Sequence, residues 1–320
     1  MIKYLIKRVL VIALLVEVAI MVEVQKPSLQ FRNDGTFKIA QIADPHYSEG
    51  KEHRLKFINE MLDIEKPDLV VYTGDFVNSE DVKDIDALFD LCISRKQLWT
   101  FTLGNHDDEH AFTRERLARY LVAKPYCIGE IGPENIGGYG NYVLEVKNKG
   151  VEKPSFLIYC FDNSYQPAGF EAKGWVSFEQ LSWYRAKSAA YTAANDGSPL
   201  PAIAFFHIPM DEYVWISSNP EKSKMLGDKG EKECLGVLNS GLFQTFHDCK
   251  DVFATFCGHD HLNDYIGEYY GITLAYGRSL CQIEVIGSRI IEISGDPSKP
   301  RLKTWLHLVD GSIVNEYIIP

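Results

Sequence analysis

The stretch Asp68-Leu-Val-Val-Tyr-Thr-Gly-Asp75 is a short apolar run that ends in a glycine and a carboxylate. Its continuous apolar character predicts a strand that is buried on both faces. Apolar side chains at helical spacing precede it at 53–64 and follow it at 82–93, and further apolar runs occupy 37–43 and 99–103. This alternation of strand and helix predicts an α/β fold with parallel pairing of the strands.

Polar residues follow each of these three strands. Asp44 comes after the first strand, Asp75 after the second and Asn105 after the third. Parallel strands end at one edge of a sheet, and ligands bind beyond that edge. We therefore expect these side chains to lie in one neighbourhood, although they are far apart along the chain.

The rest of the chain predicts more elements of the same kind, without an internal repeat or a second composition regime. Residues 23–36 are expected to form a linker or lead-in strand, and a glycine-rich loop spans 129–140. One domain over 25–320, with two sheets that face each other, accounts for the pattern. The further strands are predicted at 142–146, 156–161, 201–206, 251–257, 272–276, 289–294 and 302–308, and the further helices at 109–122, 177–194 and 243–249.

Histidines follow two of the later strands. His207 comes after the run 201–206, and Gly258-His-Asp-His261 comes after 251–257. Taken alone, His207 could be a core histidine, Asp44 a turn cap and Gly104-Asn105 a turn. Their joint order at strand ends, with metal-compatible groups in every segment, favours a metal site over coincidence. Three other histidines are expected on the surface, namely His53, His110 and His247.

The spacing of the candidate ligands predicts two ions side by side. Asp75 is the candidate bridge, and Gly74 before it lets the backbone approach the metals. Asp44 and His46 are two residues apart, so on an extended segment they face the same side. His259 and His261 repeat this spacing, whereas Asp260 between them points the other way. Two aspartates and a hydroxide leave two divalent ions a residual positive charge, which attracts a phosphate group.

Composition excludes several other classes of protein. The chain has 320 residues, a net charge of −11 and a pI of about 5.3, so nucleic acid is not an expected partner. Seven cysteines without a Cys-x-x-Cys pair favour neither a zinc ribbon nor a disulfide scaffold. Cys160 and Cys257 lie in apolar runs and are expected to be buried free thiols.

The N-terminus differs in character from the rest. Basic residues precede an apolar stretch over 9–22 that Glu17 interrupts. This pattern predicts a signal peptide or N-terminal anchor over 1–24, hence a secreted or membrane-associated protein of the secretory pathway. A retained leader, with a cytoplasmic protein, is the alternative.

The motifs together resemble those of the calcineurin-like metallophosphoesterases. Within this superfamily, the chain most resembles the purple-acid-phosphatase-like branch of plants, fungi, protists and bacteria that lacks the iron-binding tyrosine. The resemblance rests on D-x-H, G-D, G-N-H-D, a separate H and G-H-x-H in this order. It implies a four-layer αββα sandwich with two mixed β-sheets and a dinuclear centre of iron, zinc or manganese. One ion would bind Asp44, His46, Asp75 and His261, and the other would bind Asp75, Asn105, His207 and His259.

The resemblance also implies a reaction. A metal-bridging hydroxide would hydrolyse phosphate monoesters of small molecules or phosphoproteins. His106 would contact the phosphate or protonate the leaving oxygen, and Asp107 would tune His106 by a hydrogen bond. A phosphodiesterase using the same site is the alternative, and a non-catalytic scaffold is the rival from another class. Asn78 stands where purple enzymes carry their iron-binding tyrosine, so a colourless protein is expected. We expect the pocket to be lined by the loop 129–140 and by the segments 162–165 and 211–218. Tyr213 and Trp215 in the last segment either stack on the substrate or pack against the protein.

Overall fold

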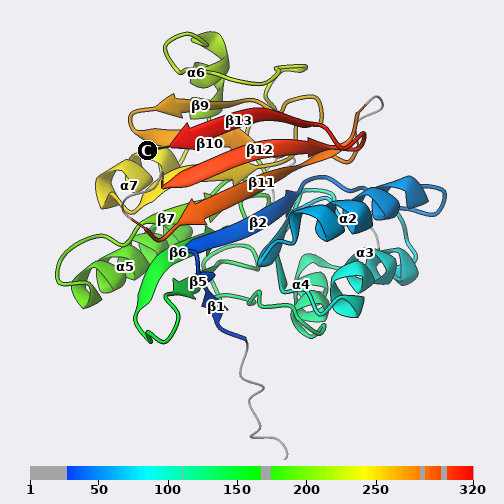
Figure 1. Ribbon diagram of the computed structural model, residues 1–320, viewed down its shortest axis with the longest axis horizontal. Coiled ribbons are helices and arrows are strands. Elements are labelled where there is room, and N and C mark those ends of the chain that lie inside the picture. Colours follow the sequence, from blue (N-terminus) through cyan, green and yellow to red (C-terminus); the bar gives the residue numbers. More distant parts are fainter. Residues whose placement is uncertain (1–26, 110, 167–173, 282–284, 297–300, 320) are drawn as a thin grey trace, which may run out of the picture.

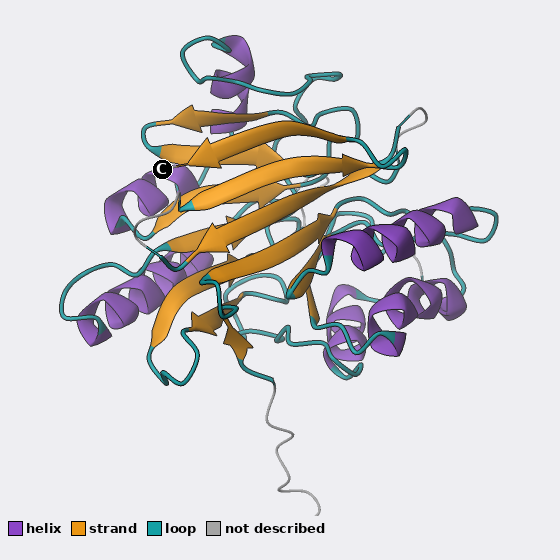
Figure 2. Cartoon of the chain, in the orientation of Figure 1, coloured by secondary structure: helices purple, strands orange, loops and turns teal. Residues whose placement is uncertain are grey.

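The computed structural model describes residues 27–109, 111–166, 174–281, 285–296 and 301–319. Two sheets face each other, with helices outside them (Figures 1 and 2). From edge to edge, one sheet contains β13 (Ile313–Ile319), β12 (Leu302–Leu308), β11 (Gly287–Ser294), β2 (Thr36–Ile42), β3 (Leu69–Thr73) and β4 (Trp99–Thr102). The other contains β1 (Leu29–Gln30), β5 (Tyr142–Lys147), β6 (Pro154–Cys160), β7 (Ala202–Phe205), β8 (Val252–Cys257), β10 (Ile272–Tyr276) and β9 (Ile266–Tyr269).

Both sheets mix parallel and antiparallel pairs. Strands β2, β3 and β4 are parallel neighbours, as the sequence predicts, and β6, β7, β8 and β10 form a second parallel series. Strands β11, β12 and β13 are antiparallel additions beside β2. The carboxyl ends of the parallel strands supply the segments that carry the candidate ligands.

The side chains of β3 show why its sequence is apolar throughout. Val70 and Tyr72 pack beneath α2 (Glu52–Glu65), α3 (Val82–Ser94) and α4 (Arg114–Val122). Leu69 and Val71 point the other way and pack between the two sheets. A third apolar cluster lies under α5 (Phe178–Ala194), α6 (Glu212–Ser218) and α7 (Leu242–Cys249). Three buried clusters thus separate four layers, which confirms the predicted αββα sandwich with two mixed sheets.

Some boundaries differ from the sequence prediction. Helix α4 begins at Arg114 rather than at residue 109, because the side chain of Thr113 caps it by accepting from the Arg116 amide. Helix α6 and strands β9 and β13 were not predicted, since short elements carry little periodic signal. Residues Leu29–Gln30 form the expected lead-in strand, paired with β5. Cys160 and Cys257 are buried free thiols, as predicted.

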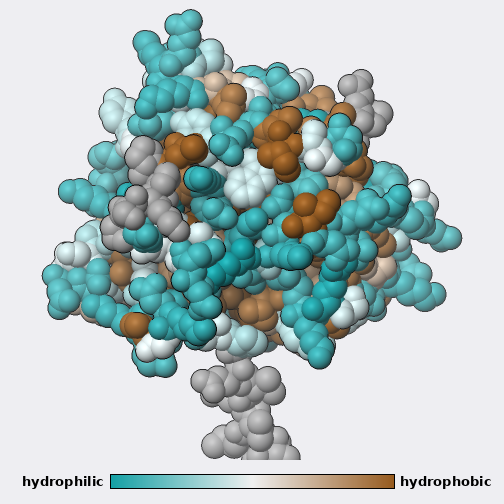
Figure 3. Space-filling model, in the orientation of Figure 1, coloured by the Kyte–Doolittle hydropathy of each residue, from teal (hydrophilic) through white to brown (hydrophobic). Residues whose placement is uncertain are grey.

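On the face that carries β11, β12 and β13, hydrophobic side chains form separate patches among hydrophilic ones (Figure 3). Exposed apolar residues near these strands are Val309, Ile313 and Ile318.

The predicted signal or anchor over 1–24 lies outside the described residues. Among the residues that are described, no helix has the length and apolar character needed to cross a bilayer.

Candidate metal centre

The strand ends bring the predicted ligands to one place. Ligand atoms of Asp44, His46, Asp75 and His261 lie within 4.8 Å of one another, and so do those of Asp75, His207 and His259. The Asn105 Oδ1 atom adds to the second group, 3.1 Å from His207 Nε2. Asp75 is common to both groups, as a bridging carboxylate would be. These groupings are the two ligand sets that the resemblance implies.

Four of the ligands are buried residues with a left-handed backbone conformation. Asp44, His46, Asp75 and His259 have φ angles of 49°, 38°, 55° and 78°. The expectation that Asp44 and His46 share a side because their segment is extended is therefore wrong. The His46 amide donates to the Asp75 carbonyl at 2.9 Å, and the His259 amide donates to the Asp44 carboxylate at 3.0 Å. Such cross-links hold a costly conformation, which is typical of functional sites.

Second partners fix how two of the imidazoles point. His46 Nδ1 donates to Asn78 Oδ1 at 2.7 Å, and His207 Nδ1 donates to the Thr73 carbonyl at 2.7 Å. The Nε2 atoms are thereby left to face the centre, in the tautomer that a metal ligand needs. Asn78 therefore does more than replace a tyrosine, because it orients the ligand His46. Asp260 accepts from Cys234 and Tyr276 and faces away from the centre, as predicted.

Two glycines make the close approach of the ligand loops possible. Gly74 has a φ angle of +86°, and a Cβ there would lie 2.5 Å from the Gly104 nitrogen and 2.6 Å from His207 Nδ1. A Cβ on Gly104 would lie 2.1 Å from Asp75 Oδ1. The sequence predicts that Gly74 lets the backbone approach the metals. In the structure the missing side chain leaves room for the loop at Gly104 and for the His207 ring.

Asp107 does not have the predicted contact with His106. Its carboxylate accepts hydrogen bonds from the backbone amides of Asp75, Phe76 and Gly104, at 3.0, 2.7 and 2.6 Å. The tuning of His106 by a hydrogen bond from Asp107 is therefore wrong. The buried carboxylate instead ties the loop after β3 to the loop after β4, and so positions the ligands.

Glu109 takes the place expected of Asp107. His106 Nδ1 lies 2.6 Å from Glu109 Oε2, and the side chains of both residues are partly exposed at the rim. The His106 amide also donates to Asp75 Oδ1 at 2.9 Å, which fixes its backbone at the centre. The sequence places residue 109 at the start of a helix and so does not predict this contact of Glu109. In the structure residues 105–108 form a turn that returns Glu109 to His106.

A buried ion pair supports the loop of Asn105. Arg114 donates to both oxygens of Asp162 and, at 2.9 Å, to the Gly104 carbonyl. Asp162 was expected around the pocket, but it is fully buried and belongs to this support. Tyr213 is also buried and bonds Thr255. The ring centroids of Trp215 and Tyr269 lie 4.4 Å apart at an interplanar angle of 41°, so both side chains agree with the packing alternative.

The donor set fits hard or borderline divalent ions. Carboxylate, imidazole and amide oxygens are the ligands that such ions take in mixed sites. In the metal-free protein, burial raises the pKa of Asp44 to about 8, opposed by the charge of His207. Burial alone would lower the pKa of His207, but Asp75 and Asp44 outweigh it and raise this pKa to about 9. Burial and the neighbouring His46 lower the pKa of His261 to about 4.

These shifts predict that metal binding releases protons. At pH 7 Asp44 and His207 each hold a proton that an ion must displace, one in each group, whereas His261 holds none. Apparent affinity should therefore rise between pH 6 and pH 8, about tenfold per pH unit for each displaced proton, and level off above the two pKa values. Calorimetry in buffers of different ionisation enthalpy should count about two protons per pair of ions at pH 7. Affinity that is independent of pH would contradict this prediction.

Comparison with known proteins agrees with the fold. The model of the calcineurin-like phosphoesterase family matches residues 37–263. The chain is 32% identical over 290 residues to probable inactive purple acid phosphatase 29 of Arabidopsis thaliana, covering 79% of this chain and 74% of that protein. It is 31% identical to phosphatase DCR2 of Saccharomyces cerevisiae, over 74% of this chain but 46% of the yeast protein. A dimetal phosphatase from Danio rerio has the same fold, with a TM-score of 0.60 at 12% identity, covering 88% of this chain and 98% of that one.

Proposed function

The chain belongs to the calcineurin-like phosphoesterase family, and from this we propose that it hydrolyses phosphate monoesters with two metal ions. The observation that carries the proposal is the pair of ligand groups that share Asp75, with His106 beside them at the rim. The name of the Arabidopsis relative includes the word inactive, and the yeast relative is named a phosphatase. This chain has all seven predicted ligands and also His106, the candidate proton donor, which supports an active enzyme rather than a scaffold.

The side chains divide the work between binding and proton transfer. When bound, the metal ions supply an activated water as the nucleophile and neutralise charge on the phosphate oxygens. Asp75 holds the two ligand groups together, and Asn78 and the Thr73 carbonyl orient two of the imidazoles. His106 donates a proton to the leaving oxygen as the bond from that oxygen to phosphorus breaks. Glu109 binds Nδ1 of His106, so that Nε2 carries the proton that is transferred.

The test uses the full chain loaded with zinc, manganese or iron, with metal content measured on the same samples. Phosphate release is followed from phenyl phosphate, from a phosphopeptide and from a bis-aryl phosphate. We expect two ions per chain and a kcat/KM for the monoesters above that for the diester. A higher value for the diester would favour the phosphodiesterase alternative. A protein that binds two ions and hydrolyses none of the esters would be a scaffold.

Glu109→Gln tests the partner of His106. The pair is partly exposed, with 42% and 53% of the two side chains accessible, so the carboxylate is expected to contribute about 0.2–1 kcal/mol. Turnover of an alkyl phosphate should fall up to about fivefold, and metal content should not change. Glu115→Gln, which removes a carboxylate from the surface of α4, is the matched control. A reduced metal content in Glu109→Gln would show that this residue acts on the centre and not on proton transfer.

A further inference from the structure

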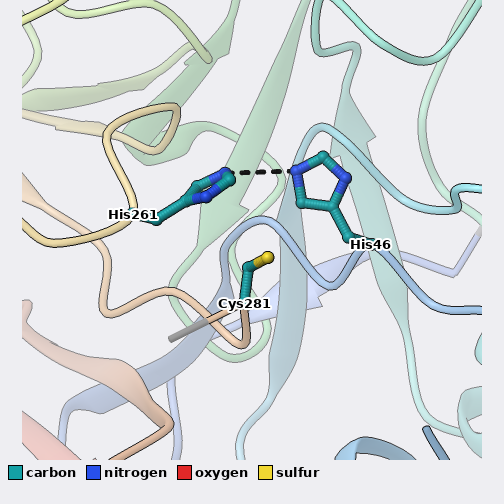
Figure 4. Close-up of side chains that lie close together, drawn as sticks. All are labelled: His46, His261 and Cys281. Atoms are coloured by element: carbon teal, nitrogen blue, oxygen red, sulfur yellow. Dashed lines mark hydrogen bonds between the residues drawn. The ribbon is translucent and has the colours of Figure 1, made fainter. Parts of the chain in front are cut away.

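One thiol lies against the first ligand group. The sulfur of Cys281 and the ring nitrogens of His46 and His261 lie within 4.8 Å of one another. Figure 4 shows the cysteine from a loop below the two imidazoles, with its sulfur toward them. Cys281 follows β10, and the chain before it is anchored next to Asp44, because Ser279 forms a bridge with Ala43 and the Leu280 amide donates to the Ala43 carbonyl at 3.0 Å.

The two histidines belong to both sets of donors. Their Nε2 atoms face each other at 3.1 Å, and the bond from His46 Nδ1 to Asn78 leaves the Nε2 lone pair of His46 on this side (Figure 4). Asp44 and Asp75 group with the histidines but not with Cys281. The two imidazoles would therefore hold an ion together with the carboxylates, and the thiol lies within reach of the same two imidazoles.

Two cationic side chains lie beside Cys281. Arg54 Nη2 lies 4.0 Å from the sulfur, and Arg54 is buried, held by the carbonyls of Pro45 and His46 at 2.6 and 2.8 Å. Its Nε has no hydrogen-bond partner among the described residues. Lys51 is close enough to interact with the cysteine electrostatically. Metals bind the thiolate form of cysteine, so a bound ion would leave a negatively charged sulfur next to these two cations.

We propose that Cys281 is a thiolate ligand of the ion held by Asp44, His46, Asp75 and His261. The first site is then a mixed nitrogen, oxygen and sulfur site, and the second, with Asn105, His207 and His259, has nitrogen and oxygen donors. Sulfur donors favour zinc-type ions over manganese. The two positions therefore differ in the metal that they select, with a zinc-type ion at the first. This inference rests on the metal centre of the proposed function, but it requires no catalytic turnover.

Cobalt(II) reports on the ligand directly, because a thiolate ligand gives a sulfur-to-cobalt charge-transfer band in the near ultraviolet. The full chain loaded with cobalt should show this band together with the visible cobalt bands. Cys281→Ser should lose the charge-transfer band and keep the visible bands. The control is Cys249→Ser, which removes a half-buried thiol from α7 and should keep both. In competition, Cys281→Ser should also lower the preference for zinc over manganese at least about tenfold.

The outcomes separate this inference from the proposed function. A cobalt protein with two ions and no sulfur band, or a band that persists in Cys281→Ser, overturns the ligand role. A sulfur band that depends on Cys281, in a protein that hydrolyses no phosphoester, supports the ligand role and overturns the proposed activity.

Discussion

Replacing Asp75 by asparagine is expected to remove most of the bound metal and, with it, the turnover. Asp75 is 1% exposed, and among the described residues it is the only member shared by the group with Asp44, His46 and His261 and the group with His207 and His259. Its Oδ2 atom lies 3.3 Å from His207 Nε2 and 3.5 Å from His46 Nε2, so one carboxylate faces ligands of both ions. An amide keeps the shape but removes the charge that offsets the repulsion between two cations.

The size of this effect follows from the burial of the charge. Removing one partner from a buried set of charges costs about 3–5 kcal/mol, which corresponds to about 10²–10⁴ in metal affinity. Equilibrium dialysis followed by metal analysis measures it. Asp260→Asn is the matched control, since Asp260 lies next to the ligand His259 but its oxygens bond Cys234 and Tyr276. Equal metal content in the two variants would mean that Asp75 does not bridge.

The strands and most of the candidate ligands could be predicted from the sequence for one physical reason. A parallel strand that is buried on both faces has a continuous apolar sequence, as in β3, and its polar neighbour must lie at the carboxyl edge. The positions of Asp44, Asp75, Asn105, His207 and His259 all follow from this rule. The rule says nothing about backbone conformation, so the left-handed residues at the centre were missed.

The supporting residues could not be predicted because their partners are distant in the chain or depend on one turn. Asp107 bonds amides of residues 75 and 76, and Arg114 bonds Asp162, with no sequence pattern that joins them. Glu109 reaches His106 because α4 begins later than its periodicity suggests. Cys281 approaches His46 through the bridge between Ser279 and Ala43, a contact across the two sheets. Local patterns therefore located the ligands but not the groups that orient them.

His106→Ala is the substitution that distinguishes an enzyme from a metal-binding scaffold. No ligand group includes His106, but its amide bonds Asp75 and its ring lies 5.7 Å from that of His46, so it stands at the edge of the centre. A proton donor contributes about 10²–10⁴ to the rate, and we expect a loss of this size for an alkyl phosphate, with metal content nearly intact.

The leaving group identifies proton donation as the cause of that loss. A nitrophenolate leaves without help, whereas an alkoxide needs a proton, so the defect of His106→Ala should be much smaller with nitrophenyl phosphate than with an alkyl phosphate. A purely structural role would reduce both rates alike. His53→Ala, at an exposed position on α2, is the matched control and should leave both rates unchanged. Wild-type turnover of the alkyl ester by His106→Ala would contradict the assignment, because the ions alone would then account for the departure of the leaving group.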